Sequence, residues 1–575
     1  MRRLLPLVVC LLAARVAAAG EVVVKAAPND GRDHTREFLA AIAACPKKHA
    51  RLVIPPGKYD LFAGKNPADA NTLMVFDGFE DLSVDGQGAE LIFHGQTSCL
   101  GFRNCRAVTL RNLVIDWARP PHSVGTVTAA GDKSFDVQVA PEFPVAGGEP
   151  IGAYMDFDPA TRLPARHGLD EYGTVESTEL IGPQRLRVHL KGQARIKPGV
   201  LAVLRHQVYG GTAVAMNRCK DARVENLTMY SVPGMGVVAG VTENVTLDRV
   251  RVMLRPGTGR LVSATADATH FGGCKGTVEL RDCLFEGMGD DAVNVKSGLY
   301  LTVREKLDAR TVIAQHNLKM TDLPDPGDAV EFSHVDTLLP YATGVVKSAR
   351  LLGADGLHRV EFAAPLPGEL KPGDVVGNVS RAPRVRVARC VVRNNRARGM
   401  LIQTRDALVE NCRFENCTSG GVWVMTEVVY FFESIGTRDV VVRNNTFINC
   451  NYGGPLGEGV LMATAYLKDF QYPPRSGVHR RVLFEGNTIR GADNAGIFAA
   501  GVDGLTVKGN TIEDVCRMPT RDEGRDAIAV RSSTNVRIEG NTVEPGKQGA
   551  AFRSALGVGP GVPAGGLSQA GNKGF

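Results

Sequence analysis

The stretch VARCVVRNNRARGMLIQTRDALVENCRFENC, residues 387–417, decides the fold. Within it the hexapeptide VARCVV (387–392) returns as VENCRF (409–414) after 22 residues, with apolar residues first and last and cysteine fourth. The short β-branched runs lie between Asn and Gly turns, and they lack the period of 3.6 that marks an amphipathic helix. A unit of this length made of short strands predicts one coil of a solenoid.

The same hexapeptide recurs along most of the chain, often with Asn or Cys at its fourth position. Its further copies are LRNLVI (110–115), VENLTM (224–229), LDRVRV (247–252), LRDCLF (280–285), VRNNTF (442–447), FEGNTI (484–489), VKGNTI (507–512) and IEGNTV (538–543). Most separations equal one unit or one unit plus a loop. Such coils stack into an all-β, right-handed parallel β-helix with strands about 4.8 Å apart. We expect the repeated Asn and Cys residues to form structural ladders at equivalent turns.

Composition agrees with a long folded protein. The 575 residues exceed one compact core, and 44% hydrophobic with 22% charged residues excludes wholesale disorder. The net charge of +6 is small for this length, and we expect no nucleic-acid partner. Without Cys10, 11 of the 12 cysteines remain, an odd number that excludes a complete disulfide framework.

The N-terminal residues 1–19 have the pattern of a cleaved signal peptide. Arg2 and Arg3 precede an apolar run, and small residues follow at positions 17–19. Arg15 interrupts the run, so we expect no membrane span and a secreted or periplasmic protein. Residues 20–118 then form an N-terminal cap and the first coils, with a helix begun near Asp33 or Thr35 and a strand over 52–59.

Two long gaps in the repeat predict inserted modules. They resemble each other, since Lys197-Pro198-Gly199 in the first parallels Lys371-Pro372-Gly373 in the second. Alternating strands and tight turns predict two small antiparallel β-barrel modules. The expected organisation is barrel 1 at 119–208, β-helix coils at 209–297, barrel 2 at 298–384, C-terminal coils at 385–549, and a poorly ordered Gly/Pro-rich tail at 550–575.

The coils between the two insertions carry the strongest candidate site. Asp267 precedes Asp290 by 23 residues, one coil, and Asp291 follows directly. Three carboxylates are thereby predicted within several ångströms of one another, and repulsion raises the pKa of at least one of them. Such a group supplies the general acid and base of glycosidic bond hydrolysis. A calcium site or an Asp-rich turn are the alternatives.

Other residues are candidates for contacts to a sugar. Asn294 and Lys296 alternate on the strand after the aspartates, and Trp423 and Glu433 belong to a long aromatic-rich loop region. The predicted substrate-binding residues are His270, Asn294, Lys296, Trp423 and Glu433. The sequence contains no metal motif, phosphate loop or nucleophile elbow, and we expect neither a metal nor a cofactor.

The motifs ADATHF (266–271) and FEGMGDDAVNV (285–295), with WARPPHSVG (117–125) and YFFESIGTRDVVVRNNTF (430–447), resemble glycoside hydrolase family 110, the exo-acting α-1,3-galactosidases. The resemblance covers nearly all of the chain after the signal peptide and departs slightly at residues 430–436. It implies hydrolysis, with inversion, of terminal α-1,3-linked galactose from an oligosaccharide or glycan. By the same resemblance Asp290 is the general acid, and Asp267 and Asp291 position and deprotonate the attacking water.

Two alternatives remain open at this point. A polygalacturonase-type hydrolase is also a β-helix with an aspartate one coil ahead of a Gly-Asp-Asp sequence, but it acts on acidic polymers. A non-enzymatic, carbohydrate-binding surface solenoid is the other. The sequence does not distinguish branched from linear galactosides. Adjacent coils about 4.8 Å apart favour a separation shorter than the roughly 6.5–9.5 Å of inverting enzymes, so inversion rests on the resemblance.

Overall fold

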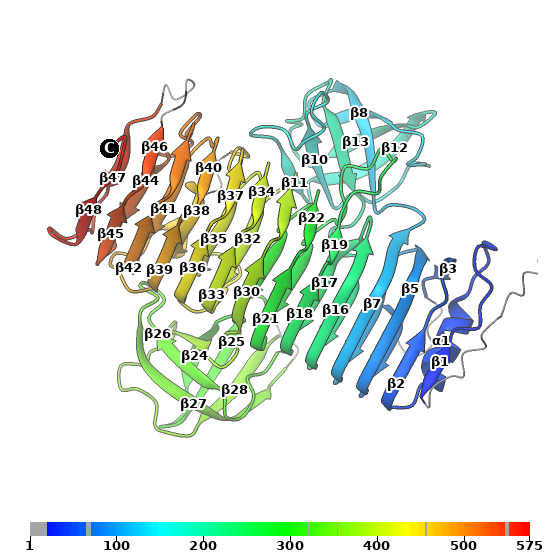
Figure 1. The fold of residues 1–575 in the computed structure, drawn as a ribbon, viewed down its shortest axis with the longest axis horizontal. Helices are drawn as coiled ribbons and strands as arrows, with labels where there is room; N and C mark the ends of the chain where they lie inside the picture. The colour runs from blue at the N-terminus through cyan, green and yellow to red at the C-terminus, as the bar shows by residue number, and fades with distance from the viewer. Residues whose placement is uncertain are drawn as a thin grey trace, which may run out of the picture.

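The computed structural model describes residues 20–64, 71–319, 322–353, 355–454, 457–544, 546 and 551–575. The predicted signal peptide, 1–19, lies outside them. These residues form a long stack of parallel strands from which two antiparallel modules project on opposite sides (Figure 1). Among the described residues no helix is long and apolar enough to cross a membrane.

One face of the stack is a 12-stranded parallel sheet. Its strands are β4 (Thr72–Asp77), β6 (Ser98–Arg103), β15 (Gly211–Asn217), β17 (Gly234–Gly240), β20 (Thr269–Gly272), β23 (Val293–Lys296), β32 (Arg398–Gln403), β35 (Gly420–Glu427), β38 (Gly459–Tyr466), β41 (Ala495–Ala500), β44 (Asp526–Arg531) and β47 (Ser554–Val558). Each strand is contributed by a different coil, so this face presents side chains from successive coils side by side.

The other two faces belong to one 23-stranded sheet, because the long strands β5, β7 and β16 bend from one face to the next. Its strands are β1 (Glu21–Val23), β2 (Lys48–Val53), β3 (Lys58–Phe62), β5 (Glu80–His94), β7 (Arg106–Trp117), β16 (Lys220–Met229), β18 (Glu243–Asp248), β19 (Arg251–Val252), β21 (Lys275–Arg281), β22 (Leu284–Glu286), β30 (Arg384–Ala388), β31 (Val391–Arg393), β33 (Arg405–Glu410), β34 (Arg413–Glu415), β36 (Arg438–Arg443), β37 (Thr446–Ile448), β39 (His479–Glu485), β40 (Thr488–Arg490), β42 (Val502–Lys508), β43 (Thr511–Glu513), β45 (Val536–Glu539), β46 (Thr542–Glu544) and β48 (Leu567–Ala570). The predicted parallel β-helix is therefore confirmed.

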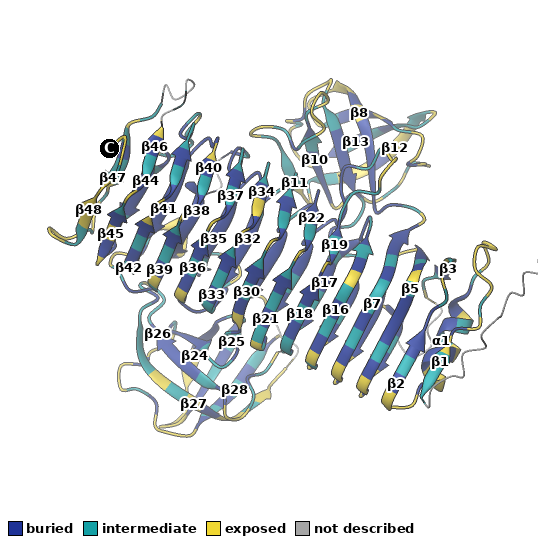
Figure 2. Ribbon diagram, viewed as in Figure 1, coloured by how far each residue is buried: buried dark blue, intermediate teal, exposed yellow. Residues whose placement is uncertain are grey.

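Apolar side chains and ladders of polar ones fill the interior. One hydrophobic cluster runs from Val24 to Ala555, and buried residues alternate along the strands (Figure 2). The buried amide of Asn487 donates to Asn510, which donates to Asn541, with Nδ2···Oδ1 distances of 3.0 and 2.9 Å. Each amide also bonds the backbone of neighbouring coils, so the ladder satisfies polar groups that the turns would otherwise bury unpaired. The cysteines after Cys10 are free and buried.

The N-terminal end is covered by helix α1 (Thr35–Ala44), which buries Phe38 and Ile42 against the first coil. A helix here shields strand edges that would otherwise lie open. The single strand expected at 52–59 is instead divided between β2 and β3, because Pro55, Pro56 and Gly57 form a turn between them.

The first insertion is a seven-stranded antiparallel sheet. Its order is β11 (Asp170–Tyr172), β10 (Ala153–Phe157), β14 (Leu201–Arg205), β8 (His122–Ala130), β9 (Ser134–Val139), β13 (Arg185–Leu190), β12 (Val175–Gly182). Its end strands β11 and β12 are not paired with each other. Asp170 of β11 instead forms an ion pair with Arg396 of the β-helix.

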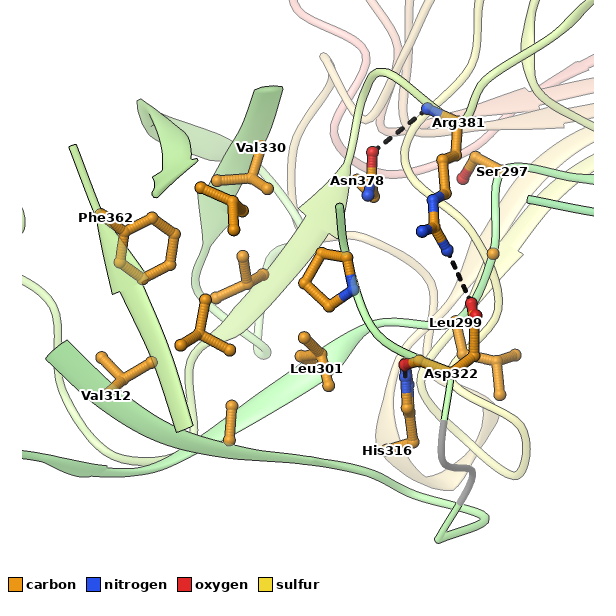
Figure 3. Close-up of a pocket in the computed structure, with 16 residues that line it drawn as sticks. Ser297, Leu299, Leu301, Val312, His316, Asp322, Val330, Phe362, Asn378 and Arg381 are labelled. Atoms are coloured by element: carbon orange, nitrogen blue, oxygen red, sulfur yellow. Dashed lines mark hydrogen bonds and ion pairs between the residues drawn. The ribbon is translucent and has the colours of Figure 1, made fainter. Parts of the chain in front are cut away.

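The second insertion closes fully into a barrel. Its order is β24 (Leu301–Lys306), β25 (Thr311–His316), β28 (Leu357–Phe362), β27 (Pro340–Leu351), β26 (Ala329–Ser333), β29 (Val375–Asn378). Val312, Val330 and Phe362 fill the interior, and Arg381 pairs with Asp322 at 2.7 Å at its end (Figure 3). The remaining cavity of about 40 Å³ holds little more than water, so the barrel is a packed core. Both insertions are small antiparallel modules, as predicted, but the sheet of the first stays open between β11 and β12 and only the second closes into the predicted barrel.

The prediction of a poorly ordered tail over 550–575 is wrong for its described part. Strands β47 and β48 pair in parallel with β44 and β45 and complete a last coil. Asn572 extends the ladder by accepting the backbone N–H of Asn541 at 2.9 Å. The prediction rested on the Gly/Pro-rich composition of the tail. A parallel strand can nevertheless form there, because backbone hydrogen bonds hold it in the sheet without large side chains. The sequence GNK at 571–573 repeats the hexapeptide turn and was the missed signal.

Candidate active site

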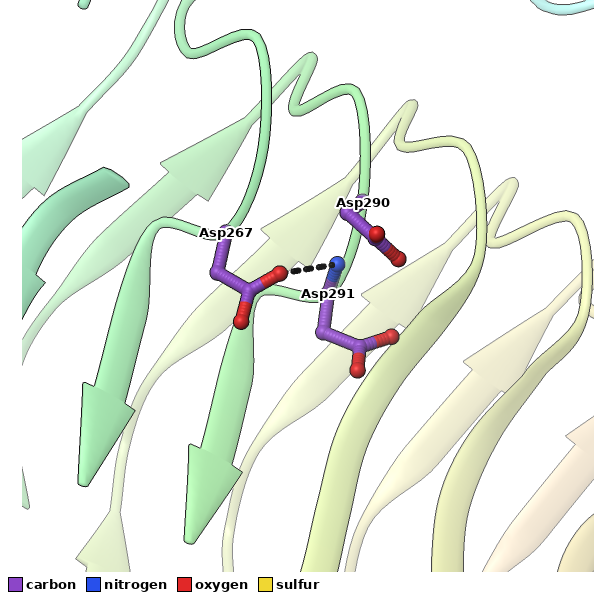
Figure 4. A group of neighbouring side chains, drawn as sticks. All are labelled: Asp267, Asp290 and Asp291. Atoms are coloured by element: carbon purple, nitrogen blue, oxygen red, sulfur yellow. Dashed lines mark hydrogen bonds between the residues drawn. The ribbon is translucent and has the colours of Figure 1, made fainter. Parts of the chain in front are cut away.

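The three aspartates lie together at the 12-stranded face. Asp267 precedes β20 by two residues, and Asp290 and Asp291 precede β23, which pairs with β20 in parallel register (Figure 4). One oxygen from each of the three carboxylates lies within 4.8 Å of the others. The backbone N–H of Asp291 donates to Asp267 Oδ1 at 3.3 Å. The structure thus brings together the residues that one coil of spacing aligns.

Two arginines from the next coil contact the aspartates. The backbone N–H and Nη2 of Arg398 donate to Asp291 at 3.1 and 2.7 Å. Arg396 Nη1 lies 3.4 Å from Asp290 Oδ1. Asp267 and Asp291 are buried, whereas Asp290 keeps part of its surface open to the cavity. Asp290 is therefore the carboxyl most accessible to a ligand.

Burial sets the protonation of this group. It raises the pKa of Asp267 well above its ordinary range, and the neighbouring Asp290 adds to that effect. Burial also raises the pKa of Asp291 to about 7, against the opposing charge of Arg398. Burial lowers the pKa of His270 to about 4, with Lys296 acting in the same direction. A neutral His270 that carries its proton on Nδ1 donates to Asp267 Oδ2 at 2.7 Å.

A cavity of about 740 Å³ opens beside the aspartates. All eight residues singled out from the sequence line it: Asp267, His270, Asp290, Asp291, Asn294, Lys296, Trp423 and Glu433. One row of side chains crosses four neighbouring strands of the 12-stranded sheet. It consists of His270 on β20, Asn294 on β23, Leu401 on β32 and Trp423 on β35. The cavity is large enough to enclose more than a single sugar ring, being within the range of small-molecule sites.

Two features of the cavity floor suit polar recognition. The buried Asn294 Oδ1 has no hydrogen-bond partner within the described protein, so a ligand hydroxyl would satisfy it. Lys296 Nζ forms an ion pair with Glu433. Burial acts to raise the pKa of Glu433, but the ammonium of Lys296 outweighs this effect, and the pKa is lowered. Trp423 is held in place by its indole N–H, which donates to Gly459 O at 3.3 Å.

The first module reaches into the site through Arg205 of β14. This arginine is fully buried and donates to Asp170 Oδ1 at 2.5 Å and to the Tyr172 hydroxyl at 3.1 Å. Its Nη1 also donates to the carbonyls of Thr265 and Gly289 at 3.1 and 3.3 Å. Those carbonyls stand just ahead of Asp267 and Asp290. Arg205 therefore fixes the two turns that carry the carboxylates.

Sequence reasoning missed several residues that line the cavity. Arg398 could have been found, because LRDCLF and VARCVV lie 107 residues apart and the same offset carries Asp291 to Arg398. Five more lie on strands of the 12-stranded sheet and so belong to repeating coils: Met235, Leu401, Met425, Glu427 and Tyr466. The others come from the modules, turns and loops, and they are Tyr172, Tyr209, Leu318, Arg396, Val429, Tyr430, Phe431, Gly457, Phe470 and Arg521.

The three carboxylates are also the one group of His, Cys, Asp or Glu residues in the described chain whose ligand atoms lie close enough to hold a metal ion. Arg396 and Arg398 already contact two of them and offset the negative charge that attracts a cation. Carboxyl groups with pKa values separated by burial are instead what acid–base hydrolysis uses. Such a trio in a cavity of a β-helix can carry out the acid–base chemistry of a glycoside hydrolase.

Comparison with known proteins agrees with this class. Residues 320–376 match the family described as GLAA-B beta-barrel domain II, and residues 377–466 the right handed beta helix region. The alpha-1,3-galactosidase B of Phocaeicola vulgatus is 30% identical over 510 residues, 82% of this chain and 83% of that protein. The alpha-1,3-galactosidase A of Shewanella woodyi is 31% identical over 422 residues, 67% of this chain and 69% of that protein.

This chain therefore belongs to the α-1,3-galactosidase family, glycoside hydrolase family 110, and is a glycoside hydrolase. Among solved structures it is similar to the catalytic unit of the GH87 α-1,3-glucanase from Streptomyces thermodiastaticus. That likeness has a TM-score of 0.43 at 13% identity and covers 98% of this chain and 70% of the other.

Proposed function

We propose that this enzyme releases terminal, non-reducing α-1,3-linked galactose from oligosaccharides or glycans, with inversion at the anomeric carbon. The observation that carries the proposal is the accessible Asp290 in front of the buried Asp267 and Asp291, with oxygens within 4.8 Å of one another, in a chain of this family. We also propose export of the protein by its N-terminal residues 1–19, as a secreted or periplasmic enzyme.

Each aspartate has a distinct task in the proposed mechanism. Asp290 donates a proton to the glycosidic oxygen as the bond to the anomeric carbon breaks. Asp267 and Asp291 hold a water on the opposite face of the sugar, and the ionised form of Asp291 accepts its proton as its oxygen attacks. A pKa of Asp291 of about 7 suits a group that takes up this proton near neutrality. The product is β-galactose, and the leaving sugar departs with the proton of Asp290.

The contacts to galactose follow from the cavity floor. Asn294 Oδ1 accepts a sugar hydroxyl, and His270 and the Lys296–Glu433 pair bond others. Trp423 offers its ring to the apolar face of the sugar. These residues bind and orient the sugar, while the aspartates act on the scissile bond.

Substrates with acidic sugars are disfavoured by the charges of the cavity. A polygalacturonase-type enzyme needs a cation free to bind the substrate carboxylate. Every cation lining this cavity in the described chain has an acidic partner. The pairs are Lys296 with Glu433, Arg396 with Asp170 and Asp290, Arg398 with Asp291, and Arg521 with Glu458. A neutral sugar fits this arrangement better.

The decisive experiment follows hydrolysis of Galα1-3Gal by NMR of the anomeric proton. We expect β-galactose to appear first and to convert slowly to the α anomer. By distance alone, carboxylate oxygens within 4.8 Å of one another favour retention. If α-galactose appears first, inversion is refuted, while the assignment of the substrate stands. Absence of galactose together with cleavage of polygalacturonate would refute the proposed function.

A further inference from the structure

A loop and a short helix at the cavity mouth expose three aromatic rings. Tyr430 and Phe431 lie in the loop after β35, and Phe470 ends the 3-10 helix η1 (Lys468–Phe470). Their exposed fractions are 61%, 50% and 38%, and all three line the cavity. Large exposed apolar side chains gathered at one mouth are typical of a binding surface.

The loop is held in place by one carboxylate. The buried Glu427 accepts backbone N–H groups of Val429, Tyr430, Phe431 and Glu433 at 2.6, 2.8, 2.9 and 3.2 Å. The second module holds the loop from the other side, because the Tyr300 N–H donates to Phe432 O at 2.7 Å. The rings are thus presented by a fixed backbone.

That backbone adopts conformations that large side chains rarely take. Phe432 has a φ of 57° and Phe470 one of 58°, both in the left-handed region. Such residues are unfavourable by about 1–3 kcal/mol and concentrate where a binding surface must be shaped. The two strained segments meet, since the rings of Tyr430 and Phe470 pack edge to face with centroids 5.6 Å apart.

The position of the rings relative to the catalytic group indicates what they bind. The loop begins its contact with the site at Glu433, on the cavity floor beside Lys296, and rises to Tyr430 at the exposed rim. A terminal galactose bound at the floor leaves the rest of the oligosaccharide to pass this rim. Pyranose rings have apolar faces that stack on aromatic side chains.

We propose that Tyr430, Phe431 and Phe470 form an aglycone platform that binds the second and third sugars of an elongated oligosaccharide substrate. The inference rests on the proposed function and deepens it. It makes the enzyme selective for galactose on a chain of at least three sugars. Leaving groups that are too small to reach the rim gain nothing from the platform.

The test compares two substrates with the same galactose. Galα1-3Galβ1-4Glc reaches the rim, whereas α-galactosyl fluoride has a leaving group of one atom. We expect Tyr430→Ala and Phe470→Ala each to lower kcat/KM for the trisaccharide by about threefold to tenfold, the loss of one stacking contact. The value for the fluoride stays within twofold. Tyr430→Phe keeps the ring and restores the trisaccharide rate.

Phe575→Ala is the matched control, since Phe575 is 45% exposed at the C-terminus and does not line the cavity. It leaves both rates unchanged. Equal losses on both substrates, or no loss on the trisaccharide, would overturn the platform while the galactosidase function stands. A wild-type enzyme inactive on both substrates would overturn the proposed function, and the platform with it. Thermal melting of each variant confirms that it is folded.

Discussion

Replacement of Arg205 tests whether the first module positions the aspartates proposed as catalytic. Arg205→Met removes the hydrogen bonds to Asp170, to the Tyr172 hydroxyl and to the carbonyls of Thr265 and Gly289. Breaking a buried ion pair by removing one partner costs about 3–5 kcal/mol, and Arg396, which still contacts Asp170, keeps this near the lower end. The two orphaned carbonyls add about 1 kcal/mol each. We expect a total destabilisation of about 5 kcal/mol.

Arg205→Lys separates stability from positioning. Lysine keeps the charge beside Asp170 but has no fork to bond both carbonyls at once, so we expect a loss of about 2 kcal/mol. Because the turns before Asp267 and Asp290 lose their shared anchor, kcat falls about a hundredfold in both variants. Urea unfolding gives the stability, and galactose release gives kcat.

The matched control is Arg187→Met in the same module. Arg187 pairs with the buried Asp136 at 2.8 Å, and neither residue lines the cavity, so the substitution alters kcat little. Retention by Arg205→Lys of a kcat within about threefold of the wild type would refute a positioning role for Arg205. If the apparent kcat fell only in proportion to the fraction of folded enzyme, that result would also contradict a positioning role.

Three further predictions concern stability. Since the pKa of Asp291 is raised from 3.8 to about 7, the folded protein holds a proton there that the unfolded chain has released, and the contribution of Asp291 to stability falls as pH rises between these values; Asp291→Asn removes this contribution, so the melting temperature of the variant relative to the wild type rises with pH in that range. Asn510→Ala breaks the ladder and lowers stability in urea by about 3 kcal/mol, whereas Asn217→Ala, at the exposed end of β15, changes it little. Lys296→Met or Glu433→Gln alone destabilises, and the double variant recovers at least about 2 kcal/mol as coupling energy in a mutant cycle.

The parts of the site that obey the repeat could be predicted from the sequence. Counting one coil of 23 residues from Asp267 to Asp290 placed the three aspartates together, although the register of β20 and β23 has an offset of 24 and puts Asp267 level with Asp291. The fixed rise of a β-helix makes spacing in sequence a measure of position. Arg398 obeys the same rule and was overlooked only because an inserted module interrupts the count.

The remaining parts depend on contacts that no repeat encodes. Asp170 and Arg205 reach the aspartates because the first module docks against the coils, and docking of a module leaves no periodic trace. The carboxylate of Glu427 organises its loop by accepting four backbone N–H hydrogen bonds. Backbone N–H groups do not depend on the side chain, so these bonds leave no signal in the sequence. The open sheet of the first module could not be predicted for the same reason. Its strand β11 contacts the β-helix through the ion pair of Asp170 with Arg396 and does not close a barrel with β12.

The cysteines carry a consequence for how the protein matures. All eleven in the described chain are free thiols buried within the molecule, and burial raises the pKa of Cys99 and Cys274 above the ordinary value. Oxidants reach a buried thiol poorly, so these side chains stay inert while the protein is folded. Among the described residues the native fold contains no disulfide that an oxidase or isomerase would have to form. The same enzyme should be obtained from a reducing cytosol and from an oxidising compartment.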